Sequence, residues 1–355
     1  MPMTLDLSAF LKSMLSVSGL SGHEAPVRKI IQDAWMPLAD ELSLSRLGSL
    51  HALQRGVAPE PRPSLLAMAH MDAIGLIVSG IQDGFLRFTQ IGGVDARILP
   101  GQMVMVHGRQ ELPGMVVQPP ARLLPAGFQD KPVPMEYLWI DLGLMPKEVE
   151  RLVRVGDLVS FAQPPFETGG ETLVGHSLDN RASVACLTHF LDILRERPHA
   201  WDVWAVASVQ EEVTLGGART SAFQLKPSLA LVVDVTFGAS PGSPAHLTFP
   251  LGKGPTLGWG PNIHPYLFKS FKDLTERLEI PFTVEVMPRH SGTDAYGVQV
   301  VESGIPCMVI SIPLRYMHTP VEMVKVKDIT RAGRLMAEFV AELPVDYLQK
   351  INWED

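Results

Sequence analysis

An apolar run ends in two adjacent carboxylates within the stretch Trp204-Ala-Val-Ala-Ser-Val-Gln-Glu211-Glu212-Val-Thr-Leu-Gly216-Gly217-Ala218. The run has strand character, and the glycine pair after the carboxylates marks the start of a helix. Because the chain bends as it leaves the C-terminal end of a buried strand, the two acids can face one pocket in different roles. One would hold a cation while the other moves protons. A solvated acidic pair at a surface loop has the same local sequence, so the rest of the chain decides between these interpretations.

The composition is typical of a globular protein with one large or two moderate domains. The chain has 355 residues, of which 46% are hydrophobic and 19% are charged. Such a chain buries a sizeable core without disulfides or structural metals. The net charge of −8 is spread along the chain, with no basic block that would indicate nucleic acid or an anionic membrane as a partner. The only two cysteines, Cys186 and Cys307, exclude a disulfide framework and a CxxC zinc motif.

The N-terminal residues indicate where the protein works. The segment Met1-Pro-Met-Thr-Leu-Asp-Leu-Ser lacks the basic region and the cleavage site of a secretory signal. No apolar run approaches the length needed to span a bilayer. We therefore expect a cytoplasmic protein without membrane contact.

Strand and helix patterns alternate on both sides of a β-rich segment. Residues 64–70 and 229–234 are apolar runs typical of buried strands, and residues 326–341 have helical spacing. This alternation predicts an α/β fold with a mostly parallel central sheet covered by helices. Short strand-like pieces between about 75 and 161 predict an inserted β-rich, barrel-like domain of barrel or sandwich type. The expected boundaries are 1–72 and 165–355 for the α/β domain and 73–164 for the insertion.

Polar side chains with metal-ligand chemistry lie at the ends of these predicted elements. They are His70 and Asp72 after one strand, Glu211 and Glu212 after another, Asp234 at the end of a third, Asp179 at a helix start, and His318 after a further strand. Because the loops at the carboxyl ends of strands in an open α/β sheet meet at one crevice, we expect these residues to converge. Two imidazoles and three carboxylates would then hold a pair of divalent cations. Nitrogen and oxygen donors without thiolates suit zinc, cobalt or manganese.

Each candidate alone also has an ordinary structural interpretation. Asp179 is typical of a helix N-cap, and His318 is typical of a solvated loop histidine. The pattern His70-Met-Asp72 has little specificity by itself. Five ligand-capable residues at five element ends nevertheless favour a metal site. His176 and His290 stay ambiguous, because both lie beside candidate site residues.

Six ordered motifs resemble those of the dinuclear-metal tetrahedral aminopeptidase family. They are Ala69-His70-Met-Asp72-Ala-Ile-Gly75, Gly175-His-Ser-Leu-Asp179-Asn-Arg181, Val209-Gln-Glu211-Glu212-Val213, Val233-Asp234, Ser291-Gly-Thr-Asp294-Ala and Arg315-Tyr-Met-His318-Thr-Pro-Val-Glu322. The family includes deblocking and glutamyl aminopeptidases, and its members are sometimes labelled endoglucanase M. The resemblance covers nearly the whole chain, including the β-rich insertion. The order of the candidate ligands also fits the wider group of co-catalytic zinc exopeptidases.

The resemblance implies a ligand set for two divalent ions, with zinc expected first and cobalt or manganese as alternatives. Asp179 would bridge the two ions. His70 and Asp234 would complete one site, and Glu212 and His318 would complete the other.

The resemblance also implies the chemistry and the assembly. Glu211 would be the general base, taking a proton from a metal-activated water and returning it to the departing amine. Asp72 would hold the second ring nitrogen of His70. The chain would thus be a metal-dependent aminopeptidase that removes N-terminal residues from short peptides. The insertion would be a dimerisation domain, and the partner would be the same chain, in a dimer or in a dodecamer built from dimers.

Four positions depart from the family pattern, namely Ala73, Thr214, Gly216 and Ser291. None of them is an expected ligand or the base, so the departures leave open only the preferred substrate and the loop geometry. Two other functions remain as alternatives. A glycoside hydrolase would need two carboxylates flanking a sugar bond and no metal pair. A catalytically silent metal-binding assembly protein would keep the ligands without turnover.

Overall fold

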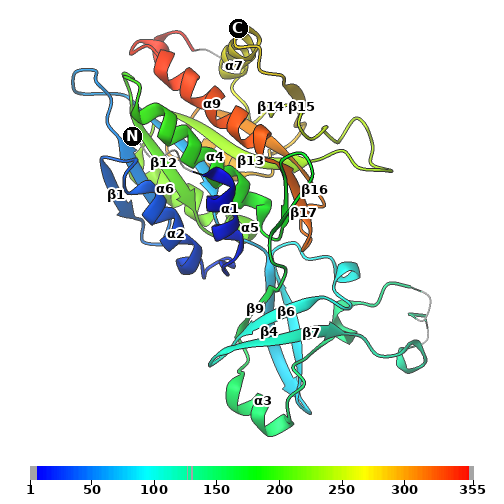
Figure 1. Cartoon of the computed structure of the whole chain (residues 1–355). Coiled ribbons are helices and arrows are strands. Elements are labelled where there is room, and N and C mark those ends of the chain that lie inside the picture. The colour runs from blue at the N-terminus through cyan, green and yellow to red at the C-terminus, as the bar shows by residue number, and fades with distance from the viewer. Residues whose placement is uncertain (1–5, 126, 129–130, 352–355) are drawn as a thin grey trace.

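The computed structural model describes residues 6–125, 127–128 and 131–351. It contains a large mixed sheet with helices on both faces and a closed β-barrel (Figure 1). The helices are α1 (Leu7–Leu15), α2 (Ala25–Trp35), α3 (Pro146–Leu152), α4 (Leu178–Arg195), α5 (Glu211–Thr214), α6 (Gly216–Leu225), α7 (Pro265–Arg277), α8 (Asp294–Gln299) and α9 (Val326–Glu342). Within the described residues, none of these helices has the length and apolar character required to cross a membrane.

Within the described residues, the larger sheet has 11 strands in the order β1-β2-β12-β3-β13-β16-β17-β11-β10, and off this path β14 pairs with β16 and β15 pairs with β14. Its strands are β1 (Glu41–Leu44), β2 (Leu50–Gln54), β3 (Ser64–His70), β10 (Phe166–Thr168), β11 (Thr172–Gly175), β12 (Asp202–Ser208), β13 (Leu229–Phe237), β14 (Thr256–Trp259), β15 (Thr283–Val286), β16 (Cys307–Arg315) and β17 (Glu322–Lys325). The central strands β12, β3, β13 and β16 run parallel, and the strands that flank them pair antiparallel. The predicted α/β fold is confirmed, with the parallel pairing concentrated at the centre of the sheet.

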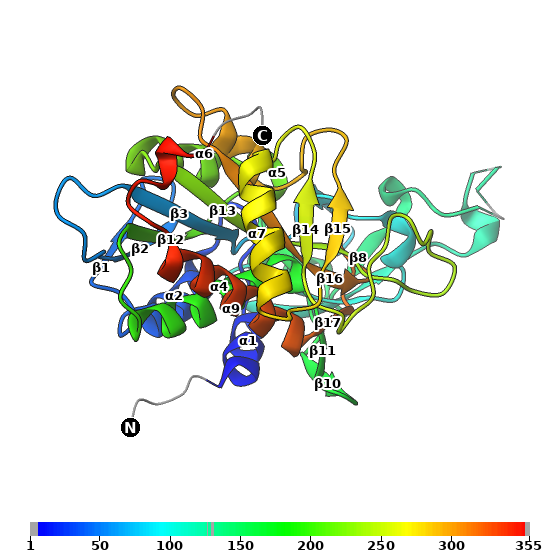
Figure 2. The ribbon, with the colours of Figure 1, turned by 90° about the horizontal axis from the view of Figure 1, so that it is seen from above.

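The central strands are apolar along nearly their whole length because helices cover both faces of the sheet. Figure 2 shows α6 on one side of these strands and α4 and α9 on the other. Helix α4 is buried over most of its length, packed against the sheet, α9 and α1. With both faces covered, the carboxyl ends of the parallel strands provide the place where a pocket can form.

The insertion is a closed barrel with its own hydrophobic core. Its strands are β4 (Gly75–Gln82), β5 (Phe85–Ile91), β6 (Met103–His107), β7 (Glu111–Val117), β8 (Trp139–Asp141) and β9 (Leu158–Phe161), closed in the order β4-β5-β8-β7-β6-β9. Buried and exposed residues alternate along β7, as expected where one face of a strand points into a barrel. The barrel extends away from the sheet in Figure 1. Of the two types that the sequence left open, the insertion is therefore a barrel and not a sandwich.

Candidate metal centre

The candidate site residues lie at the carboxyl ends of the parallel strands. His70 is the last residue of β3, and Asp234 lies in β13. Glu211 and Glu212 begin α5, directly after the short link that follows β12. The parallel register sets Ser208 beside His70, so β12 and β3 end at the same level. The sheet topology therefore brings together residues that are far apart in the chain.

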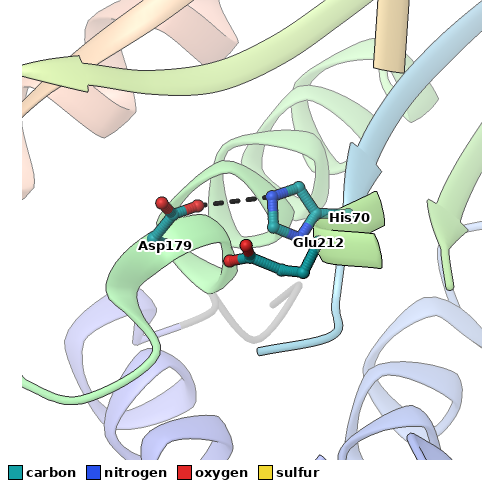
Figure 3. A group of neighbouring side chains, drawn as sticks. All are labelled: His70, Asp179 and Glu212. Carbon is teal, nitrogen blue, oxygen red and sulfur yellow. Dashed lines mark ion pairs between the residues drawn. The ribbon is translucent and has the colours of Figure 1, made fainter. Parts of the chain in front are cut away.

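Asp179 lies at the centre of the group. It precedes the regular part of α4, with φ −79° and ψ 101°, and the N-cap of that helix is Ser177. Its Oδ1 lies 3.3 Å from Nε2 of His70, and its Oδ2 lies 3.3 Å from Nε2 of His318. Figure 3 shows the Asp179 carboxylate facing the His70 ring, with the Glu212 carboxylate beside them. The two oxygens thus face two different imidazoles, as a bridging carboxylate requires.

Two further ligand candidates, both carboxylates, lie beside the imidazoles. Glu212 Oε1 lies 3.5 Å from Nε2 of His318, and Asp234 Oδ1 lies 3.9 Å from Nε2 of His70. Donor atoms of His70, Asp179 and Glu212 all lie within 4.8 Å of one another. All five ligand candidates therefore lie in one group around Asp179.

The second ring nitrogen of each histidine is held from behind. His70 Nδ1 lies 3.2 Å from the Asp72 carbonyl oxygen and 3.4 Å from its Oδ1. His318 Nδ1 lies 2.9 Å from the carbonyl oxygen of Gly93 in the inserted barrel. Histidines that bind metals typically donate their other N–H to a carboxylate or a carbonyl, which orients the ring. Both rings thus present Nε2 to the Asp179 carboxylate.

Asp72 also positions the two adjacent glutamates. Its Oδ1 accepts the Glu211 backbone N–H at 3.0 Å, and its Oδ2 accepts the Glu212 backbone N–H at 3.3 Å. The Ser21 hydroxyl donates to the same Oδ2. Burial alone would raise the pKa of Asp72, but the hydrogen bonds from His70 and Ser21 lower it. An ionised Asp72 therefore orients both glutamates and one histidine.

The adjacent glutamates face different partners. Glu211 Oε2 lies 3.7 Å from Nε2 of His70, whereas Glu212 lies beside His318. The preceding Gln210 is in the left-handed region at φ 57°, which turns the chain sharply between β12 and α5. Burial raises the pKa of Glu211 to about 10, and the neighbouring carboxylate of Asp234 adds to this shift.

The charges of the group fit divalent cations. Burial, together with the nearby charge of Asp179, raises the pKa of Asp234 well above its usual range. Although burial opposes it, the Asp179 and Glu212 carboxylates raise the pKa of His318 to about 11. Oε1 of Glu212 is buried and accepts no hydrogen bond from any described residue. Cations would neutralise the surplus negative charge and satisfy this oxygen, and the nitrogen and oxygen donors suit zinc, cobalt or manganese.

Two buried carboxylates support the site without having been assigned a role from the sequence. Glu322, 1% exposed at the start of β17, accepts the backbone N–H groups of His318 at 2.8 Å and of Asp179 at 3.1 Å. Asp294 accepts a hydrogen bond from the Ser208 hydroxyl, and burial raises its pKa to about 6. Both residues lie within the motifs that resemble those of the aminopeptidase family, and this was the only indication in the sequence that they have a functional role.

The two ambiguous histidines lie outside the group. The His176 ring packs edge-on against Phe161 with centroids 4.9 Å apart, and burial lowers its pKa to about 3. The His290 ring lies against Tyr296, with centroids 5.1 Å apart. Neither histidine lines the cavity that contains the candidate ligands.

This cavity is small and opens beside the ligands. Its volume is about 260 Å³, and it is lined by all five ligand candidates and by Glu211. Other lining residues come from β13, β15 and the loop before α8, and include Thr236, Glu285 and Ser291. A reacting group in this cavity would contact both the ligands and Glu211.

Comparison with known families assigns this arrangement. The model of the family described as M42 glutamyl aminopeptidase matches residues 48–335. The chain belongs to the M42 peptidase family. Lysyl aminopeptidase of Pyrococcus furiosus is 34% identical over 345 residues, which cover 95% of this chain and 98% of the relative.

Solved structures of M42 relatives share the whole fold. A TET aminopeptidase from a marine sediment archaeon of the Thaumarchaeota superposes with a TM-score of 0.92 at 30% identity, covering 98% of this chain and 99% of that one. The TET1 peptidase of Pyrococcus horikoshii superposes with a TM-score of 0.82 at 28% identity, covering 95% of this chain and 100% of that one. That peptidase assembles into a tetrahedron or a large octahedral shell.

Family membership decides the general activity. The chain is a metal-dependent aminopeptidase, a hydrolase that acts on peptide bonds. The glycoside hydrolase alternative is not supported, because both the family and the relatives are peptidases and the site is a cluster of histidines and carboxylates. The same comparisons favour an active enzyme over a silent assembly protein.

Proposed function

We propose that Asp179 bridges two divalent cations in this aminopeptidase. His70 and Asp234 complete one site, and Glu212 and His318 complete the other. The observation that supports this assignment is the pair of 3.3 Å contacts from the two Asp179 oxygens to His70 and His318. When bound, the ions polarise a substrate carbonyl and lower the pKa of water. Zinc is the proposed metal, with cobalt or manganese as alternatives of the same donor preference.

Glu211 is the proposed general base. Its carboxylate lines the cavity beside His70, and its backbone is held by Asp72. From there Glu211 takes a proton from the attacking water and returns it to the departing amine. Asp72 acts through its neighbours, keeping the His70 ring and the Glu211 backbone in place.

The proposed substrates are short peptides with a free N-terminus. A cavity of about 260 Å³ admits the end of a peptide chain rather than a folded protein. The family description refers to glutamyl substrates, whereas the Pyrococcus furiosus relative is a lysyl aminopeptidase. Membership in the family therefore leaves the preferred N-terminal residue open.

The proposed assembly is a homo-oligomer, either a dimer or a dodecamer built from dimers. Residues 73–164 are proposed as the dimerisation domain, and residues 1–72 and 165–355 as the catalytic domain. The separate hydrophobic core of the barrel supports this division, and the shells formed by TET1 of Pyrococcus horikoshii support the assembly. A light-scattering mass would distinguish a dimer from a dodecamer. The proposed location is the cytoplasm.

Metal removal and restoration test the proposed function. A panel of aminoacyl-p-nitroanilides should be hydrolysed by the purified enzyme, and a chelator should abolish the activity. Zinc, cobalt or manganese added back should restore it, and elemental analysis should find two ions per chain. Chelator-resistant activity on cellulose, with no cleavage of any anilide, would refute the proposal.

A further inference from the structure

One carboxylate in the cavity has no part in the proposed mechanism. Glu285, on β15, is half-buried and lines the same cavity as Asp234. The Thr236 hydroxyl donates to its Oε1 at 2.6 Å, and the Thr256 hydroxyl donates to its Oε2 at 2.6 Å. Each hydroxyl occupies one lone pair of one oxygen, so both oxygens can still accept a hydrogen bond. The threonines thus fix the carboxylate while leaving it able to bind a donor.

The charge of Glu285 lacks a cationic partner in the cavity. Among the described residues that line it there is no lysine or arginine. The charges of Asp179, Glu211, Glu212 and Asp234 would be balanced by two divalent cations. The charge of Glu285 would then remain uncompensated, and a positively charged ligand group placed beside it would be favoured.

The surroundings of Glu285 suit a long side chain. Thr236 lies two residues beyond Asp234 on the same face of β13. At 3.3 Å per residue, the two positions are about 6.6 Å apart along the strand. Phe237, Met287 and Met317 supply apolar lining to the same cavity. Lysine and arginine combine an apolar stem with a charged head, and such side chains place the stem along apolar surface and the head against an anion.

We propose that Glu285 gives this enzyme a preference for peptides whose N-terminal residue is lysine or arginine. The inference rests on the proposed aminopeptidase function, which places the N-terminal residue of the substrate beside the ligand group. The stem of the substrate side chain lies against the methionines, and its cationic head is bound by Glu285. An acidic N-terminal residue would bring a second negative charge to the same place and would be rejected.

The test compares anilides of lysine, arginine, methionine and glutamate on the metal-loaded enzyme. Methionine is the neutral reference, because its unbranched stem resembles that of lysine. The kcat/KM for lysine should exceed that for methionine, and glutamate should be the poorest substrate. In Glu285→Gln the lysine-to-methionine ratio should fall roughly 10- to 100-fold, since hydrogen bonds to charged groups contribute in this range. The loss should appear mainly in KM.

Glu276→Gln is the matched control, because Glu276 lies on the surface helix α7 and pairs with Lys272. It should keep the wild-type ratio. Inhibition of the wild-type enzyme provides a measurement that needs no variant: free lysine should inhibit cleavage of the methionine anilide more strongly than free methionine does.

Three outcomes would overturn the inference. If the enzyme cleaves the methionine anilide but does not prefer the lysine and arginine anilides, the inference about Glu285 is wrong and the aminopeptidase function still stands. A Glu285→Gln variant that loses activity equally on all four anilides would show that Glu285 supports the cavity and does not read the side chain. Failure to cleave any anilide would overturn the proposed function, and this inference with it.

Discussion

Replacing Glu211 by Gln separates proton transfer from metal binding. The substitution keeps the size of the side chain, and the backbone N–H of residue 211 still donates to Asp72 at 3.0 Å. What is lost is the ability to accept a proton. General acid–base catalysis contributes about 10²- to 10⁴-fold, so kcat should fall by that factor, or by about 3–5 kcal/mol of transition-state stabilisation. Steady-state kinetics on an aminoacyl anilide measures the loss, and elemental analysis should still find two ions.

The neighbouring substitution Glu212→Gln is the matched control. It removes a charge of the same kind one residue later, but from the side chain that lies 3.5 Å from His318. This variant should therefore lose metal from one site, and added metal should restore part of its activity. If Glu211→Gln retained full turnover, or if it lost metal as Glu212→Gln does, the division of roles between the two glutamates would be wrong.

The metal-free protein provides a second measurement on Glu211→Gln. Burial raises the pKa of Glu211 to about 10 in the fold, above its ordinary value of 4.5. The native state therefore holds a proton that the unfolded chain releases, so the stability of the metal-free protein should decline as pH rises between these two values. Gln does not titrate, so the variant should lose less stability over pH 5–9. Urea unfolding of both chelated proteins tests this, and an identical pH dependence would contradict it.

Two further substitutions address residues that support the fold and the site. Glu322→Gln leaves one acceptor oxygen for the two backbone N–H groups of His318 and Asp179. Metal affinity should therefore fall about 10- to 100-fold, as is typical when a partner of a metal ligand is changed. Chelator competition measures the affinity, and an unchanged value would count against the positioning role of Glu322. Asp328→Asn weakens a buried carboxylate that accepts backbone N–H groups of Gly252 and Gly254. It should cost about 1–3 kcal/mol of unfolding free energy, with metal content unchanged; loss of metal would contradict its purely structural role.

The convergence of the candidate ligands could be predicted from the sequence because of how parallel sheets are built. Buried parallel strands are long apolar runs, and their carboxyl ends meet at one edge. Polar residues placed directly after such runs, as His70 and Glu211 are, therefore converge whatever the loops do. Glu322 and Asp294 could not be assigned a role in this way. Their function depends on which backbone amides and hydroxyls lie opposite them, and that is a property of tertiary packing.

The less regular parts of the fold also could not be predicted from the sequence. The strands β1, β10 and β17 are three or four residues long, and runs of that length have no distinct periodicity. Their antiparallel pairing was therefore not predicted. Closure of the barrel depends on β4 pairing with β9, for example Leu76 with Val159, across more than eighty residues of chain. Local alternation cannot distinguish such a closed barrel from two packed sheets.

The inserted barrel and the ligand group are parts of one structure. The segment Gly92-Gly93 follows β5 and reaches the ligand group, where the Gly93 carbonyl oxygen lies 2.9 Å from Nδ1 of His318. A Cβ at Gly93 would lie 2.9 Å from that nitrogen, and one at Gly92, where φ is +72°, would lie 2.6 Å from the Ile74 side chain. Close approach therefore requires glycine at both positions. Because this carbonyl orients the His318 ring, a displacement of the barrel would change the orientation of a proposed metal ligand. Any assembly that fixes the barrel would therefore also hold that ligand in place.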